Sequence, residues 1–379
     1  MKSLAPLPTP DRIVDLDGRV HTGWFERPFS LVNLEDAAPF ADAREGGGLI
    51  GAWLARRRGS PIERKARALA LKRWHYTSVV SDRILFGCAV VDVGYVGNAF
   101  AYVVDRVTGR KHEYSTLTPG AAGILIASNS LDGTTSIRFP GFGALALHND
   151  SKTGLRRIEA SLEGSKRSGR PPLEASIAIR DDGASPPPIV CVDEPEPHTC
   201  LYTHKVYALE AEGRVVAGDL GDAFDRTTGL AGLDYNVGYR PRETYWNWAA
   251  AAGRSAAGVR LGFNLTAHRR PGEGMNSRGD DAGDCGLWLD GERVKLEHVV
   301  FEYDRADLMS EWRIRDDEGL VDLRFSPAGE RAEDVNAGLV VSRFHQPYGT
   351  FRGRLRSRSG TSHVLEDVYG VVEQHFARW

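Results

Sequence analysis

The stretch RILFGCAVVDVGYVGNAFAYVVDRVTGRKHEYS, residues 83–115, decides the fold class of this chain. Its two apolar segments, residues 84–91 and 99–104, have strand length and are rich in β-branched and aromatic residues. Asp and Gly at 105–109 then separate the second segment from a polar, strand-like segment at 111–115, which is typical of a hairpin. The stretch therefore predicts antiparallel strands joined by tight turns.

The same turn chemistry recurs along the chain. Asp-Gly occurs at 132–133, within a predicted hairpin over 129–139, and again at 290–291, and Asp-Glu-Gly occurs at 317–319. Helical periodicity is confined to residues 36–44, 50–57 and 61–73, with a short segment near 304–309. Closely spaced strands with few helices predict a mainly β chain built as antiparallel sandwiches or barrels. The 42 glycines among 379 residues agree with many tight turns that need positive φ.

A proline-rich stretch near the middle of the chain is the best candidate for a domain boundary. Residues 181–197 include Pro186, Pro187, Pro188, Pro195 and Pro197. Proline cannot donate to a strand ladder, so this stretch is excluded from a central strand. We therefore predict two β-barrel-like domains, at residues 1–185 and 186–379. The first domain includes a basic helical segment at 56–73.

Composition excludes several classes of protein. The 48 Lys and Arg residues face 51 Asp and Glu residues, so we expect no general nucleic-acid binding. The sequence has no run of 18 apolar residues, so we expect no membrane-spanning helix. The first 12 residues lack the apolar core of a secretory signal. Four scattered cysteines give no disulfide framework, so a cytoplasmic location is expected.

Positive charge is concentrated in one short segment. Eight basic residues occur within 18 positions, with Glu63 as the only acid: Arg56, Arg57, Arg58, Arg64, Lys65, Arg67, Lys72 and Arg73. A solvated helix at the end of a β domain is the favoured interpretation. The alternative is a peripheral contact with anionic membrane through residues 56–73.

The most unusual segment is LDYNVGYRPRETYWNW, residues 233–248. Ligand pockets combine aromatic walls with a few polar groups, as this segment does. A carboxyl desolvated among aromatic rings has a raised pKa and is suited to general acid catalysis, which makes Asp234 and Glu243 candidates. The candidate ligand-binding residues of the segment are Tyr235, Arg240, Tyr245, Trp246, Asn247 and Trp248. The alternative is a rigid aromatic packing corner.

Two further clusters carry candidate site residues. Residues 72–76 end in Trp74, His75 and Tyr76, and on a strand Trp74 and Tyr76 face one side while His75 faces the other. Residues 198–204 combine His198, Cys200, Tyr202 and His204. The spacing fits no strong zinc pattern, so ordinary strand residues or a polar cavity wall with Tyr202 and His204 are favoured, and no metal is expected.

The C-terminal region offers two further candidate groups. Residues 342–349 resemble a loop that presents His345 to a ligand, although a lone histidine is a poor predictor of catalysis. Glu373, His375 and Trp379 near the C-terminus are interpreted as residues that close a barrel edge. The sequence contains no G-x-S-x-G, P-loop, H-E-x-x-H or dinucleotide-binding motif, so serine-hydrolase and nucleotide-dependent chemistry are disfavoured.

Several motifs resemble those of a known family. Residues 72–115, TYWNWA at 244–249, FNLT at 263–266 and YGVVEQHFARW at 369–379 resemble the family called domain of unknown function 2804. That family is distantly similar to the double lipocalin-like group of AttH, hydroxyneurosporene synthase (carotenoid 1,2-hydratase) and tocopherol cyclase. The resemblance implies two consecutive calycin-type barrels and acid chemistry on hydrophobic isoprenoid or polyketide molecules, without a metal or redox cofactor. It assigns no catalytic residue.

Three functional hypotheses follow. The first is a cofactor-independent hydratase, lyase, isomerase or cyclase, with Asp234 or Glu243 as the acid, His204 and Arg240 as orienting groups, and the aromatic residues as the cavity wall. The second is a noncatalytic carrier of a lipid or another hydrophobic ligand. The third is a carbohydrate-active protein, since aromatic rings beside carboxylates also suit sugars.

Overall fold

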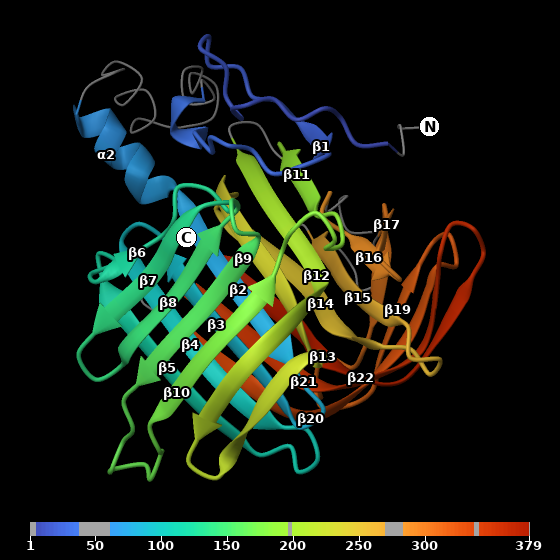
Figure 1. Cartoon of the computed structure of the whole chain (residues 1–379). Coiled ribbons are helices and arrows are strands. Elements are labelled where there is room, and N and C mark those ends of the chain that lie inside the picture. The colour runs from blue at the N-terminus through green and yellow to red at the C-terminus, as the bar shows by residue number, and fades with distance from the viewer. Residues whose placement is uncertain (1–4, 38–60, 196–198, 270–282, 337–340, 379) are drawn as a thin grey trace.

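The chain folds into two curled antiparallel sheets that lie against each other (Figure 1). The computed structural model describes residues 5–37, 61–195, 199–269, 283–336 and 341–378. The two helical elements of this part, the 3-10 helix η1 (Leu34–Asp36) and α2 (Pro61–Ala70), both precede the main strands. The prediction of a mainly β fold with two antiparallel barrel-like units and short N-terminal helices is confirmed.

The larger sheet holds 13 strands of the described chain, and every pairing in it is antiparallel. Its main path runs through β5 (Lys111–Pro119), β4 (Val96–Asp105), β3 (Ile84–Asp92), β2 (Lys72–Val80), β13 (Leu220–Tyr239), β12 (Cys200–Ala217), β10 (Leu173–Arg180), β9 (Leu155–Leu162), β8 (Gly143–Asp150), β7 (Gly133–Phe139) and β6 (Ile124–Leu125). Beside this path, β11 (Ile189–Asp193) pairs with β12 and with β1 (Gly23–Phe25).

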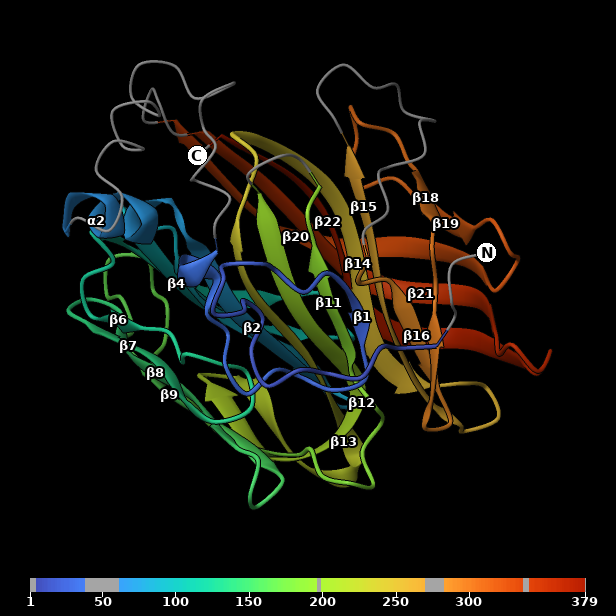
Figure 2. The same ribbon diagram turned by 90° about the horizontal axis from the view of Figure 1, so that it is seen from above.

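The smaller sheet holds nine strands of the described chain and is also antiparallel throughout. Its order is β17 (Glu292–Lys295), β16 (Gly286–Leu289), β15 (Arg260–Arg269), β14 (Glu243–Arg254), β22 (Ser362–Arg378), β21 (Val341–Arg356), β20 (Val321–Asn336), β19 (Trp312–Asp316) and β18 (Val299–Glu302). Figure 2, seen from above, shows the strands of this sheet fanning out beside β12 and β13 of the larger sheet.

Most of the predicted hairpins form. The turns at 105–109, 290–291 and 317–319 join β4 to β5, β16 to β17 and β19 to β20. The hairpin predicted over residues 129–139 is wrong, because β7 begins at Gly133 and pairs with β6 on that side. The Asn129 side chain instead accepts hydrogen bonds from the backbone N–H groups of Leu131 and Asp132, both at 2.9 Å, which favours a loop.

In the sequence, the proline-rich stretch lies between two strands of the larger sheet. β10 precedes it and β12 follows it, and these two strands are hydrogen-bonded neighbours. The chain changes sheet at residues 240–242, between β13 and β14. The carbonyl of Pro187 accepts a hydrogen bond from Trp288 Nε1 at 2.8 Å, so the stretch also contacts the smaller sheet. A division into domains at 185/186 stays a prediction.

The basic segment is partly used inside the molecule. Arg67 of α2 donates to the carbonyls of Glu35 and Ala37, at 2.7 and 2.8 Å. Lys72 Nζ donates to the carbonyl of Val93 at 2.7 Å, and Arg73 forms an ion pair of 2.5 Å with Asp92. Residues 56–60 lie outside the described residues, and contact of this segment with a membrane stays a prediction. In the described chain, no helix has the length and apolar character needed to cross a bilayer.

Candidate functional site

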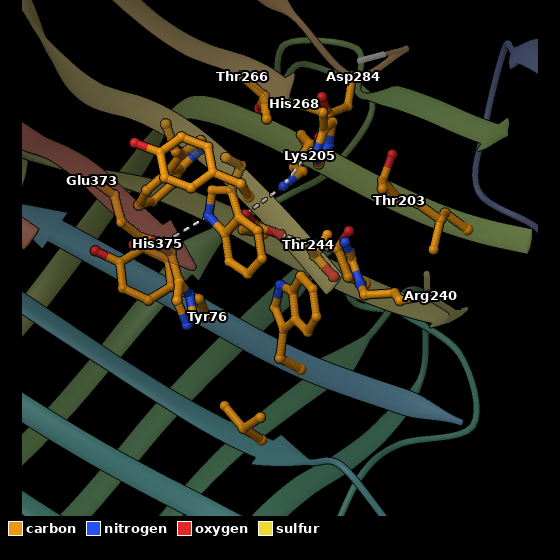
Figure 3. Close-up of a pocket in the computed structure, with 18 of the residues that line it drawn as sticks. Tyr76, Thr203, Lys205, Arg240, Thr244, Thr266, His268, Asp284, Glu373 and His375 are labelled. Atoms are coloured by element: carbon orange, nitrogen blue, oxygen red, sulfur yellow. Dashed lines mark hydrogen bonds and ion pairs between the residues drawn. The ribbon is translucent and has the colours of Figure 1, made fainter. Parts of the chain in front are cut away.

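A cavity of about 210 Å³ lies between the two sheets. The larger sheet contributes side chains from β2, β3, β4, β12 and β13, and the smaller sheet contributes β14, β15, β21 and β22. The two strands of greatest length in the larger sheet, β12 and β13, are buried on both faces over much of their length, since one face packs inside the larger sheet and the other meets the smaller sheet. The site is therefore formed by the packing of two sheets (Figure 3).

Aromatic rings form much of the cavity wall. The rings of Trp74 and Trp246 stack with centroids 6.3 Å apart, and Tyr76 meets Trp248 edge-on at 5.5 Å. The guanidinium of Arg240 lies 4.1 Å from the Trp74 centroid, a cation–π contact. Burial lowers the pKa of Arg240 to about 10, although nearby carboxylates oppose this shift, so Arg240 carries its charge at neutral pH.

Glu373 is a buried carboxyl at one side of the cavity. Its Oε1 accepts a hydrogen bond from Trp246 Nε1 at 2.7 Å, and its Oε2 accepts one from Gln346 Nε2 at 3.0 Å. Burial raises the pKa of Glu373 from 4.5 to about 7, outweighing these two hydrogen bonds. Near neutral pH, Glu373 therefore exists in both its protonated and its ionised form, as a general acid must.

His375, two residues further along β22, stays neutral beside this carboxyl. Its ring lies 4.2 Å from that of Trp246, and its Nε2 is 2.9 Å from Ser342 Oγ. Burial lowers the pKa of His375 to about 3, with Arg240 and Arg331 adding to the shift. His375 Nδ1 is 3.8 Å from Glu373 Oε1. Because the neutral ring carries no charge, it does not form an ion pair with Glu373. Burial therefore remains the largest effect on the pKa of Glu373.

A charged cluster lies on the opposite side of the cavity in Figure 3. Lys205 Nζ donates to Asp234 Oδ2 and lies 3.3 Å from Asp284 Oδ2. Asn236 Nδ2 donates to the other oxygen of Asp234. Burial raises the pKa of Asp234 although Lys205 opposes the shift. Burial also acts to raise the pKa of Asp284, but Lys205 and His268 together hold it below its usual value.

The structure brings several of the predicted site residues together at this cavity. The predicted residues that line it are Trp74, Tyr76, Asp234, Arg240, Glu243, Tyr245, Trp246 and Trp248. Glu243 is half-exposed and forms an ion pair of 2.8 Å with Arg378 Nε. Among the two carboxyl groups predicted as acids, Asp234 is buried against a lysine and Glu243 is bound to a surface arginine.

Four predicted site residues lie on the other face of their strands. His75, Tyr202, His204 and Tyr235 alternate with cavity residues on β2, β12 and β13 and point into the core of the larger sheet. His204 Nδ1 is 2.7 Å from Ser130 Oγ, and Tyr202 OH is 3.2 Å from the same oxygen. Tyr235 donates to the carbonyl of Ala127 at 2.7 Å. These groups are hydrogen-bonded core residues outside the cavity wall.

Two other predicted residues also lie outside the cavity wall. The Asn247 side chain donates to Tyr303 OH at 3.0 Å and to the carbonyl of Glu373 at 3.2 Å. Asn247 therefore supports the backbone at Glu373. His345 Nδ1 lies 2.7 Å from Glu330 Oε1 on the neighbouring strand.

The sequence missed the groups that complete the site. The sequence pattern does not point to Lys205, Asp284 or Gln346, and it predicts Glu373 and His375 as barrel-edge residues. Their positions are up to 170 residues apart in the chain, and only strand pairing brings them together. The register pairs Trp248 with Glu373 and Trp246 with His375 across β14 and β22. The one available signal was the alternation of Glu373 and His375 in an apolar strand.

Side chains of the kinds that bind metal ions do not cluster in the described part of the chain. No group of three or more His, Cys, Asp or Glu side chains there is placed to hold a metal ion. Cys200 is a buried free thiol and His204 faces Ser130, while His198 lies outside the described residues.

Comparisons with known proteins concern the fold and the family. A structure similar to this one is kievitone hydratase from Nectria haematococca, with a TM-score of 0.46 and 13% identity over 80% of this chain and 88% of that chain. Another is an AttH-like protein from Nitrosomonas europaea, with a TM-score of 0.48 and 12% identity over 80% and 91%. A search of curated proteins finds no match. The family model for a domain of unknown function, DUF2804, matches residues 6–379, and the chain therefore belongs to the DUF2804 family.

Proposed function

We propose that this protein is an enzyme that performs acid-assisted chemistry on a hydrophobic small molecule. The observation that carries the proposal is the buried carboxyl of Glu373, whose pKa is raised to about 7 within an aromatic cavity between two sheets. The reaction class is hydration, elimination, isomerisation or cyclisation of an isoprenoid-like or lipid-like substrate. Proton transfer from a carboxyl to carbon or oxygen requires no cofactor.

Glu373 is the general acid in this proposal, in place of Asp234 or Glu243. Its protonated carboxyl transfers a proton to an alkene carbon or to a departing hydroxyl oxygen, and positive charge develops on the substrate. In a hydration, water adds to the neighbouring carbon, which carries the positive charge, and a proton of that water returns to the Glu373 carboxylate. In an elimination or isomerisation, a neighbouring C–H bond supplies the returning proton.

The cavity wall stabilises the charge that develops. The rings of Trp246, Trp248 and Tyr76 line the cavity, and the negative face of an aromatic ring attracts a cation. Trp246 also holds Glu373 through its indole N–H, so the acid and an aromatic face are fixed to each other. This arrangement stabilises a cation-like transition state without moving charged groups during the reaction.

The test is isotope exchange. The purified protein is incubated with a panel of isoprenoid alkenes and allylic alcohols in D₂O and in H₂¹⁸O, and the products are analysed by mass spectrometry. We expect deuterium or ¹⁸O incorporation that Glu373→Gln reduces at least about 100-fold, a typical contribution of general acid catalysis. Glu366→Gln, an exposed residue of the same strand β22, is the matched control and retains the activity.

The same experiment separates the competing functions. Exchange that survives Glu373→Gln but disappears in Glu243→Gln contradicts the assignment of the acid. Exchange absent from the native protein, together with an apolar ligand found by native mass spectrometry, favours the noncatalytic carrier. A co-purified sugar favours the carbohydrate-active alternative.

A further inference from the structure

The side of the cavity away from Glu373 carries polar atoms that no protein group satisfies. Thr203 Oγ1, Asp284 Oδ1 and Arg240 Nε are buried and have no hydrogen-bond partner among the described residues. Thr203 and Asp284 are 6% and 5% exposed, and all three residues line the cavity. Buried polar groups are nearly always hydrogen-bonded in native proteins, so these three atoms indicate a polar group of a ligand. A fourth unpartnered atom of the cavity lining, Gln346 Oε1, lies on the side of Glu373.

Asp284 belongs to the charged cluster, and Thr203 and Arg240 adjoin it. Lys205, two residues from Thr203 on the same face of β12, lies 3.3 Å from Asp284 Oδ2. That contact engages one carboxylate oxygen of Asp284 and leaves the other without a hydrogen-bond partner among the described residues. Arg240 follows β13 directly, and the charges of Asp234 and Asp284 act on it. Figure 3 shows Thr203, Arg240 and Asp284 on the side opposite Glu373 and His375.

The chemistry of the unpartnered atoms specifies the group that they would bind. Asp284 Oδ1 accepts a hydrogen bond, Arg240 Nε–H donates one, and the Thr203 hydroxyl does either. A hydroxyl group donates and accepts at the same oxygen and therefore matches this set. Among the described residues, the carboxylates of Asp234 and Asp284 balance Lys205 and Arg240, so an added negative charge would face two carboxylates.

We propose that Thr203, Arg240 and Asp284 bind an uncharged hydroxyl group of the substrate. The apolar body of the substrate then lies along the aromatic wall, with its reacting carbon at Glu373. The substrate class is an amphipathic molecule with a hydroxyl at one end and an alkene or leaving group at the other. This inference rests on the proposed function, because it assigns the substrate of the same cavity.

The test compares three probes with one carbon skeleton: geraniol, its methyl ether and geranic acid. Binding is measured by the fluorescence of the cavity tryptophans and by calorimetry. We expect geraniol to bind at least about tenfold more tightly than the methyl ether, which cannot donate, and than the acid, which is charged. Thr203→Val and Asp284→Asn each remove most of this preference, while Glu373→Gln keeps it.

The thermal midpoint separates a binding role from a structural one. Thr203→Val removes an unsatisfied buried hydroxyl, so the variant keeps or raises the midpoint while it loses the preference for geraniol. Equal binding of geraniol and its ether, or no measurable binding of either, overturns the proposal. Tighter binding of geranic acid also overturns it. All three results leave the isotope-exchange test of Glu373 unaffected, so the two proposals fail independently.

Discussion

Glu373 and Asp234 are both buried carboxyl groups in one cavity, yet their neighbours give them different properties. Asp234 contacts the ammonium group of Lys205, which stabilises its ionised form against the effect of burial. Within the described part of the chain, Glu373 has hydrogen-bond donors but no cation in direct contact, so burial dominates its pKa. The sequence could not separate these two cases, because the lysine and the indole come from other strands.

The Glu373 pKa predicts a pH dependence of stability. In the unfolded chain Glu373 ionises near pH 4.5, and in the folded protein it ionises near pH 7. Between these values the folded state keeps a proton that the unfolded state has lost, so the stabilising contribution of Glu373 falls as pH rises through this window. We expect the free energy of unfolding of Glu373→Gln to rise by about 3 kcal/mol relative to that of the native protein between pH 4.5 and 7.5. Each pH unit in this window contributes about 1.4 kcal/mol.

Urea unfolding at pH 5 and pH 8 measures this difference. The comparison of native protein and variant at each pH cancels the opposite contribution of His375, whose lowered pKa makes stability rise between about pH 3 and 6.5. Glu366→Gln serves as the control, and its stability difference stays constant. A Glu373→Gln difference that does not change with pH contradicts the raised pKa.

Activity should depend on pH for the same reason. A general acid must be protonated, so the isotope-exchange rate is expected to be highest below about pH 7 and to fall about tenfold for each pH unit above it. The rate is measured from pH 5 to 9 at saturating substrate. A rate that rises through pH 7 would show that the ionised carboxylate, acting as a base, is the active form.

At the scale of the element, strand alternation decides which residues reach the cavity. On β12, Thr203 and Lys205 face the smaller sheet, while Tyr202 and His204 face the core of the larger sheet. The sequence predicted strands and alternation correctly. It did not show which face was the cavity face, because both faces of β12 are buried and carry polar groups.

Two adjacent residues of β12 should therefore respond in opposite ways. His204→Leu removes the hydrogen bond to Ser130 in the core and is expected to lower stability by about 1–3 kcal/mol without changing ligand affinity. Thr203→Val is expected to change affinity without lowering stability. Denaturant unfolding and probe titration of both variants check this. Loss of ligand affinity in His204→Leu with unchanged stability would place the histidine in the site.

The role of individual glycines is a second feature of the strands that the sequence does not reveal. The high glycine content was interpreted as a requirement of tight turns, and Gly109 at φ 70° fits this. Gly87 and Gly232 instead lie within strands β3 and β13, where a Cβ atom would come within 2.4 Å of the Tyr102 ring and 2.0 Å of the Tyr207 ring. These glycines make room for cross-strand tyrosines, a requirement that depends on register.

At the scale of the whole molecule, the two sheets are joined by a buried arginine. Arg331 of β20 is 2% exposed, and its Nε lies 2.7 Å from Glu113 Oε1 of β5. Its guanidinium also lies 3.8 Å from the Phe100 centroid and 4.7 Å from that of Phe344. Since both rings line the cavity, Arg331 connects the seam between the sheets to the cavity wall.

Disruption of this contact should loosen the association of the sheets. Arg331→Met is expected to lower stability by about 2 kcal/mol, since Glu113 loses one partner but keeps Lys111 at 2.6 Å. A double-mutant cycle with Glu113→Gln measures the coupling, expected at about 0.5–3 kcal/mol. Strict additivity of the two substitutions would show that the ion pair does not join the sheets.

The sequence by itself determined the class of the fold and the composition of the cavity wall. Apolar strand-length segments and Asp-Gly turns specify antiparallel hairpins because they act over a few residues. The aromatic segment at 233–248 supplied Trp246 and Trp248 for the same reason of local composition. Tertiary structure alone decided the environment of the charged groups, because Glu373 and Lys205 lie on separate strands and Asp284 lies in the turn before β16. Their pKa values and open hydrogen-bonding positions arise from burial and from neighbours that only the packing of the two sheets brings together.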